Sequence, residues 1–173
     1  ERALPSPAGG IDFTVGEALR TPAFWLISAG HGSALVLVAA LLVHFVPYAT
    51  EELGYSLQGA AQVVLLLTLL QAVGQLLGGV VGDRFPKRLI AAACMGGHAL
   101  ALAMLAVASA LWMVLAFALI HGFAWGVRGP LMGSIRADYF GRRAFGVIMG
   151  ISNIFAMVGM IVGPLVVGVV VDR

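Results

Sequence analysis

The chain has 173 residues, of which 61% are hydrophobic and 10% are charged, with a net charge of +2 and a mean hydropathy of +1.01. Soluble domains carry about 25% charged residues. This composition therefore excludes an ordinary soluble enzyme, a disordered tail and a nucleic-acid-binding protein. The single cysteine, Cys94, excludes a disulfide framework and a cysteine-built metal site. The class that remains is an integral membrane protein.

The first 20 residues are polar and rich in proline and glycine. They lack the short apolar stretch behind a basic terminus that is typical of a signal peptide. We therefore predict a linker over residues 1–20 and a transmembrane domain over residues 21–173. The chain starts at Glu1 and stops directly after an apolar run, which predicts a fragment of a longer protein.

Long stretches without charged residues mark the membrane-spanning helices, each of which needs about 20 apolar residues. The apolar region from residue 89 to about residue 133 is about twice that long. It is therefore predicted to hold two helices with a tight turn near Ser109. The five predicted spans cover about residues 23–48, 57–82, 89–109, 111–133 and 145–170. The fold class is an all-α membrane protein, a polytopic transmembrane helix bundle.

The distribution of charge predicts the orientation of the helices. The loops at residues 83–88 and 136–143 each carry three basic residues and one acid. Cytoplasmic loops are enriched in Lys and Arg, so both loops are predicted to be cytoplasmic, which requires two helices between them. The loop at residues 49–57, with two glutamates and no base, then lies outside. Residues 1–20 lie in the cytoplasm.

Two similar segments end the second and the fifth predicted spans. They read GVVGDR at residues 79–84 and GVVVDR at residues 168–173, and five of the six positions are identical. Chance is one explanation, because glycine and valine are common in this chain. The other explanation is an inverted repeat of three helices plus three, an arrangement found in many secondary transporters.

The loop after the second span carries a recognisable signature. The major facilitator superfamily has the pattern Gly-x-x-x-Asp-Arg-x-Gly-Arg/Lys-Arg/Lys, and Pro86 replaces its second glycine here. The other signature positions match Gly79, Asp83, Arg84, Lys87 and Arg88. The chain therefore resembles the carboxy-terminal half of a transporter of that superfamily, over roughly residues 12–173.

Two further segments support this resemblance. Gly159-x-x-x-Gly163-Pro164 resembles an antiporter-type signature of the superfamily. Residues 138–146 are similar to the loop before helix 11 in oxalate/formate antiporter and monocarboxylate transporter-like members. The resemblance implies that the five spans are helices 7–11 of an inverted-repeat half, that residues 1–20 belong to the central cytoplasmic loop, and that an amino-terminal half is missing.

The signature loop has a physical interpretation as a gate. Asp83 ends a helix among basic residues and is predicted to pair with them or with the positive amino-terminal end of the last span. Breaking such contacts would open the cytoplasmic side. The simpler alternative is that these charges only fix the topology.

Arg128 is the most informative polar residue within the spans. It is predicted to lie about 10 Å from the middle of its helix, toward the cytoplasm. A buried arginine is costly and is a functional hypothesis by default, and its guanidinium suits a carboxylate. The alternatives are structural pairing and snorkelling of the side chain to the interface.

The remaining cavity candidates come from the same helix and from its expected neighbours. His121 and Trp125 share a helix face with Arg128, and the resemblance implies that helices 7, 8, 10 and 11 line the central cavity. Proton coupling is considered first for His31 and His121, whereas His98 lies on a helix expected at the periphery. Hydrogen bonding between helices is the alternative for the amides. The full set of cavity candidates is Arg128, His121, Trp125, His31, Gln71 and Asn153.

Glycines at four-residue spacing predict close helix packing, with hinges as the alternative. They occur at residues 74–82, 122–126 and 146–150, and Gly159 and Gly163 continue a small-residue stripe on the last span. Pro164 is predicted to kink that span.

The predicted function is secondary active transport of a small solute, an organic anion such as a monocarboxylate, by alternating access as a symporter or antiporter. The expected partners are the substrate, a proton or counter-anion and the lipid bilayer, in the bacterial inner membrane. No enzyme activity, cofactor, metal or nucleic acid is expected. Monocarboxylate-type relatives often carry an arginine on the second span, and this chain has none there. The alternatives are a neutral-solute or drug-efflux transporter, a membrane scaffold, and a haem-binding subunit.

Overall fold

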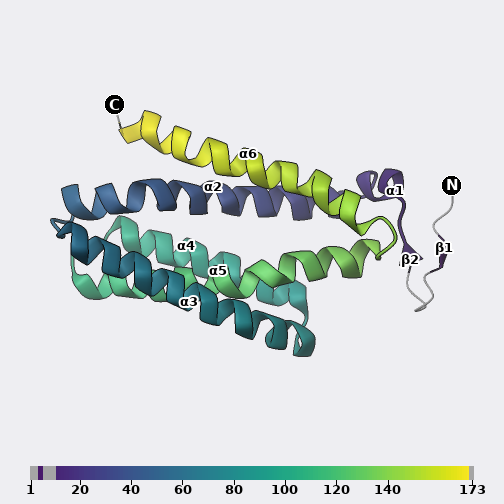
Figure 1. Ribbon diagram of the computed structural model, residues 1–173, viewed down its shortest axis with the longest axis horizontal. Coiled ribbons are helices and arrows are strands. Elements are labelled where there is room, and N and C mark those ends of the chain that lie inside the picture. Colours follow the sequence, from purple (N-terminus) through teal and green to yellow (C-terminus); the bar gives the residue numbers. More distant parts are fainter. Residues whose placement is uncertain (1–3, 6–10, 172–173) are drawn as a thin grey trace. The chain divides into compact units, whose positions relative to one another are not determined.

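The computed structural model describes residues 4–5 and 11–171, which form six helices and two short strands (Figure 1). The strands β1 (Leu4–Pro5) and β2 (Ile11–Asp12) pair antiparallel. The helices are α1 (Val15–Leu19), α2 (Pro22–Glu51), α3 (Leu57–Arg84), α4 (Lys87–Ala106), α5 (Leu111–Phe140) and α6 (Phe145–Val171). Part of the predicted linker, residues 1–3 and 6–10, and the last two residues of the second repeat segment, 172–173, lie outside the described residues.

Among the described helices, α2 to α6 are long and apolar enough to cross a membrane. This confirms the predicted all-α bundle with five spans. The long apolar region forms two helices, because α4 ends at Ala106 and α5 begins at Leu111. Large apolar side chains point outward, where a bilayer would cover them: Leu26, Leu42 and Leu76 are 72%, 74% and 79% exposed. The chain is an integral membrane protein.

Helix α5 is longer than the predicted span. The sequence-based prediction ended the span near residue 133 and placed Arg136 in a loop, and the placement of Arg136 is wrong because the helix continues to Phe140. The helix stops at Gly141, whose φ of 76° lies in the left-handed region that glycine adopts without strain. The connection to α6 is therefore short, and Arg136 belongs to the helix.

The chain divides into two compact units, each described here by itself. Unit 1 consists of residues 1–44 and 133–173, and unit 2 consists of residues 45–132. Helices α2 and α5 each contribute one part to unit 1 and one part to unit 2.

In unit 1, small residues let α2 and α6 approach closely. A Cβ atom on Gly32 would lie 2.9 Å from the carbonyl oxygen of Phe155. On the facing helix, Gly159 and Gly163 lie directly against the backbone of Gly32 and Val36. This is close packing between glycine-rich faces, as is common between membrane helices.

The chain before α2 is folded onto the turn between α5 and α6. In the predicted linker, a Thr14–Glu17 capping box starts helix α1. Four buried apolar residues then form a cluster that joins α1, α2, α5 and α6: Ala18, Phe24, Phe140 and Ile148. At this end of unit 1, Phe13 contacts Phe140 edge to face, with ring centroids 5.9 Å apart.

In unit 2, glycines on both sides bring α3 and α5 into backbone contact. Gly122 lies against Leu67, and Gly126 lies against Gln71. From the other side, Gly74 and Gly78 face the backbone of α5, and a Cβ atom on Gly74 would lie 2.6 Å from the carbonyl oxygen of Phe123. The two predicted glycine stripes thus face each other.

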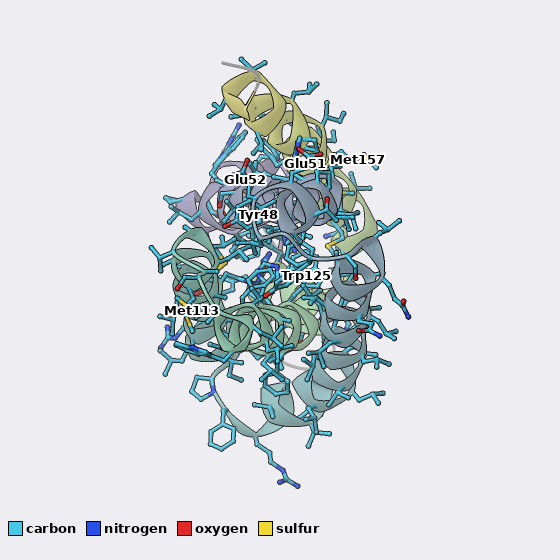
Figure 2. The ribbon with its side chains drawn as sticks, turned by 90° about the vertical axis from the view of Figure 1, so that its left-hand side faces the viewer. Tyr48, Glu51, Glu52, Met113, Trp125 and Met157 are labelled. Carbon is cyan, nitrogen blue, oxygen red and sulfur yellow. The ribbon has the colours of Figure 1, made fainter. Side chains whose placement is uncertain are left out.

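The end of α2 packs on α4 and α5 within unit 2. Phe45 stacks on Phe117, with ring centroids 5.6 Å apart. The Tyr48 hydroxyl donates a hydrogen bond to the carbonyl of Leu105, at 3.1 Å. Figure 2 shows Tyr48 with Glu51 and Glu52 near this end, and both glutamates are exposed.

Candidate functional site

Arg128 lies deep in unit 2 on α5. Its side chain is 2% exposed, and its guanidinium carbon lies 5.4 Å from the centroid of the Trp125 ring. This is the range of a cation–π contact. Because α5 extends to Phe140, Arg128 is about 18 Å from the end of its helix at 1.5 Å per residue. The guanidinium is held inside the helix bundle and does not snorkel.

A second polar contact in unit 2 joins α4 to α5. The Nδ1 atoms of His98 and His121 lie 3.1 Å apart, and the two side chains are 3% and 2% exposed. Two of the histidines of this chain therefore form a buried pair, which the sequence analysis did not single out. The absence of a side chain at Gly97 and the short side chain of Ala124 let the helix of His98 approach α5.

Trp125 links these two features. Its ring centroid lies 6.2 Å from that of His98, and the Arg128 guanidinium packs over the same indole. On the other side of the pair, Phe117 contacts the His121 ring, with centroids 5.4 Å apart. Two imidazoles, an indole and a guanidinium therefore form one continuous polar strip along the α4–α5 contact.

The other cavity candidates are half-buried. Gln71 lies on α3, where its backbone contacts Gly126 of α5. His31 on α2 and Asn153 on α6 belong to unit 1. The convergence of all six candidates on one cavity stays a prediction.

The signature loop lies at the junction of α3 and α4. Asp83 and Arg84 are exposed in the last turn of α3, and Lys87 and Arg88 begin α4. Gly79 faces open space one turn earlier. Among the described residues, no ion pair joins Asp83 to a basic side chain of this loop. A gating role for the loop stays a prediction.

Sequence reasoning missed a buried polar cluster in unit 1. Arg136 is 1% exposed, and its Nε donates a hydrogen bond to Ser152 Oγ at 3.0 Å. Ser152 Oγ also shares a hydrogen bond of 2.8 Å with Ser28 Oγ. The cluster joins α2, α5 and α6. The sequence offered one signal for this cluster, which was Gly141. A helix that continues as far as this glycine includes Arg136.

Pro164, which follows Gly159 and Gly163 on α6, takes part in a polar contact with α2. The His44 Nε2 atom lies 3.0 Å from the carbonyl oxygen of Pro164. A carbonyl can only accept, so Nε2 of His44 carries the hydrogen. This contact lies further along the same α2–α6 face as Gly159 and Gly163.

Comparison with known proteins identifies the family. Over 151 residues the chain is 28% identical to the Triacylglyceride transporter of Mycobacteroides abscessus, an alignment that covers 80% of this chain and 28% of that protein. The chain thus spans little more than a quarter of the length of this relative. Residues 15–173, nearly the whole chain, match the Major Facilitator Superfamily. The five membrane-spanning helices and this match agree with the resemblance inferred from the loop signature, and the chain belongs to the Major Facilitator Superfamily.

Proposed function

We propose that this chain is part of a secondary active transporter that moves an organic anion by alternating access. The observation that carries the proposal is the burial of Arg128 inside a membrane-spanning helix of a superfamily member. A buried ionisable group within a span is expensive and is kept for function. A guanidinium binds a carboxylate through two parallel hydrogen bonds. The guanidinium also packs over the Trp125 ring, 5.4 Å from its centroid.

In this proposal, the substrate site lies near the middle of the membrane. Arg128, His121, Trp125 and Gln71 of unit 2 contribute to it. Transport proceeds by rocking of this bundle against an amino-terminal half around the site.

The cytoplasmic side carries the gate. Asp83, Arg84, Lys87 and Arg88 open and close contacts there, and residues 1–20 lie on the same side. The protein resides in the bacterial inner membrane, and a proton or a counter-anion drives transport.

A neutral apolar solute is the second candidate, because the relative from Mycobacteroides abscessus is named a Triacylglyceride transporter. In that case Arg128 shapes or gates the pathway through Trp125 and does not bind the substrate. The two candidates differ in the charge of the solute, so transport assays with carboxylates and with a neutral lipid distinguish them.

Counterflow in proteoliposomes tests the proposal with the protein made from its complete reading frame. The vesicles are preloaded with unlabelled formate, oxalate or pyruvate, and uptake of the labelled compound is followed. Arg128→Gln removes the charge inside the bundle. Arg20→Gln is the matched control, because Arg20 is exposed and precedes α2.

Exchange of one carboxylate that disappears in Arg128→Gln and persists in Arg20→Gln supports anion transport at Arg128. The second candidate is tested by transfer of a fluorescent triacylglycerol from proteoliposomes to acceptor vesicles. Transfer of this lipid, together with no carboxylate exchange, would replace the anion proposal with the apolar one.

A further inference from the structure

Two buried imidazoles face each other in the α4–α5 contact of unit 2. The Nδ1 atoms of His98 and His121 lie 3.1 Å apart, which is a hydrogen-bond distance, and both rings are almost fully buried. The ring centroids are 4.5 Å apart. Nε2 of His98 is buried, with no hydrogen-bond partner among the residues that the structure describes.

The contact fixes the number of protons that the two rings can hold. A hydrogen bond between two Nδ1 atoms needs one atom with a hydrogen and one with a free lone pair. One additional proton can be added on Nε2 of the donor ring, and the bond then becomes charge-assisted and stronger. A second additional proton would place two N–H groups face to face and break the bond. The pair is therefore built to hold one extra proton.

The surroundings of the pair determine when that proton is stable. Within unit 2, residues 57–82 of α3 carry no titratable side chain. Apart from Lys87 and Arg88 in its first turn and His98 itself, α4 offers only Cys94, one turn before His98. From the end of α2, the Tyr48 hydroxyl is engaged by the carbonyl of Leu105. The charged group next to the pair is Arg128, which packs on the indole that also contacts His98. Residues 57–82 of α3, 87–106 of α4 and 111–132 of α5 contain no aspartate or glutamate, so these segments supply no carboxylate to balance a second positive charge.

An anion bound at Arg128 would supply that balance. It neutralises the guanidinium and so favours an additional positive charge on the neighbouring pair. Linkage requires the reverse as well: a proton on the pair strengthens binding of the anion by the same factor. The two ligands are then carried together.

We propose that His98 and His121 form a one-proton site that couples proton movement to anion transport, so that the protein is a proton–anion symporter. This inference rests on the proposed function, because it needs an anion at Arg128. The coupling role is assigned to a pair with one histidine on α4 and one on α5. His98 is needed because its Nδ1 shares the hydrogen bond with Nδ1 of His121 that stabilises the extra proton.

The test separates exchange from accumulation in proteoliposomes containing the complete protein. Labelled formate, oxalate and pyruvate are the probes, the membrane potential is held at zero with potassium and valinomycin, and protein-free liposomes give the passive background. With an outside pH about one unit below the inside, one-to-one symport drives accumulation toward about a tenfold ratio, since one pH unit corresponds to about 1.4 kcal/mol. The initial rate of accumulation above that of the protein-free liposomes reports symport by the protein. Counterflow without a pH gradient reports substrate movement alone.

His98→Gln is the informative variant, because the amide preserves a hydrogen bond to His121 but does not bind a proton. Its accumulation is expected to fall to the passive background while counterflow continues. His44→Gln is the matched control, because His44 is bonded to the carbonyl of Pro164 and lies outside the pair. It is expected to accumulate the probe as the unmodified protein does.

Each outcome is decisive. If the unmodified protein shows no counterflow, the proposed function fails together with this inference. If counterflow is present but the unmodified protein does not respond to the pH gradient, or if His98→Gln accumulates the probe normally, only the one-proton site is overturned.

A direct measurement remains decisive if His98→Gln does not fold. Binding of the transported carboxylate to the unmodified protein in weakly buffered detergent is followed with a pH indicator. Uptake of one proton for each carboxylate bound supports the proposal, and binding without proton uptake refutes it.

Discussion

The carboxylate of Asp12 accepts a hydrogen bond of 2.7 Å from the backbone N–H of Arg142. The same oxygen lies 3.4 Å from the backbone nitrogen of Arg143. The backbone N–H of Phe13 in turn donates to the carbonyl of Phe140, at 3.0 Å. Asp12 is 8% exposed, so these bonds are shielded from water. The segment before α2 is therefore anchored to the turn between α5 and α6 by both polar and apolar contacts.

Asp12→Ala is expected to destabilise this turn by about 1.5–3 kcal/mol, which is typical of hydrogen bonds to charged groups. Loss of the carboxylate leaves the amides of Arg142 and Arg143 without their acceptor. Thermal unfolding of the detergent-solubilised protein measures the effect. Glu52→Ala serves as the control, because Glu52 is exposed at the end of α2. An equal shift in both variants would contradict the anchoring role of Asp12.

The buried serine cluster predicts non-additive effects. Ser152→Ala removes the acceptor of Arg136 Nε and the partner of Ser28 at once. We expect a loss of about 1–3 kcal/mol for Ser152→Ala and a smaller loss for Ser28→Ala. In the double variant, the loss should be smaller than the sum, since the two hydroxyls share one bond. Additive changes in unfolding free energy would show that the bond contributes nothing.

Close packing of α3 on α5 predicts a difference between two glycines. Gly126→Leu places a large side chain against the backbone of Gln71 and is expected to abolish the folded, monodisperse protein in size-exclusion chromatography. Gly96→Leu is the matched control, because a Cβ atom at Gly96 meets nothing within 4 Å. Equal yields of the two variants would mean that the α3–α5 contact does not limit folding.

Arg128→Lys separates charge from geometry at the proposed substrate site. Lysine keeps the positive charge but loses the planar fork and the stacking on Trp125. The carboxylate concentration that gives half-maximal exchange is expected to rise about tenfold, equivalent to about 1.4 kcal/mol. An unchanged half-maximal concentration in Arg128→Lys would argue against two-pronged binding and for a simple electrostatic role.

The sequence predicted the helices well because charged residues mark where apolar spans stop. The division of residues 89–133 into two helices followed from bilayer thickness and from the two basic loops on one side, and it is confirmed. The same reasoning failed for Arg136, since it treated every charge as a helix end. Arg136 does not follow that assumption, because its side chain is buried in the bundle and donates a hydrogen bond to a hydroxyl group there. The partner, Ser152, is 16 residues further along the chain, so no local pattern reveals the contact.

The candidate site was accessible to sequence reasoning only in part. Spacing along α5 correctly places Trp125 beside Arg128, because neighbours within one helix follow from its period. The pairing of His98 with His121 depends on how α4 packs on α5, which no local pattern encodes. The arrangement of Asp12 over the turn at Gly141 is likewise a long-range contact between segments about 130 residues apart.

The backbone contact between α3 and α5 has a consequence for solutes that dissolve in the membrane. Gly122 meets Leu67, Gly126 meets Gln71, and Gly78 meets Val127, so the contact continues over about 16 Å of α3 at 1.5 Å per residue. No acyl chain fits between backbones that touch over this length. A lipophilic molecule entering unit 2 sideways from the bilayer therefore has no portal between these two helices.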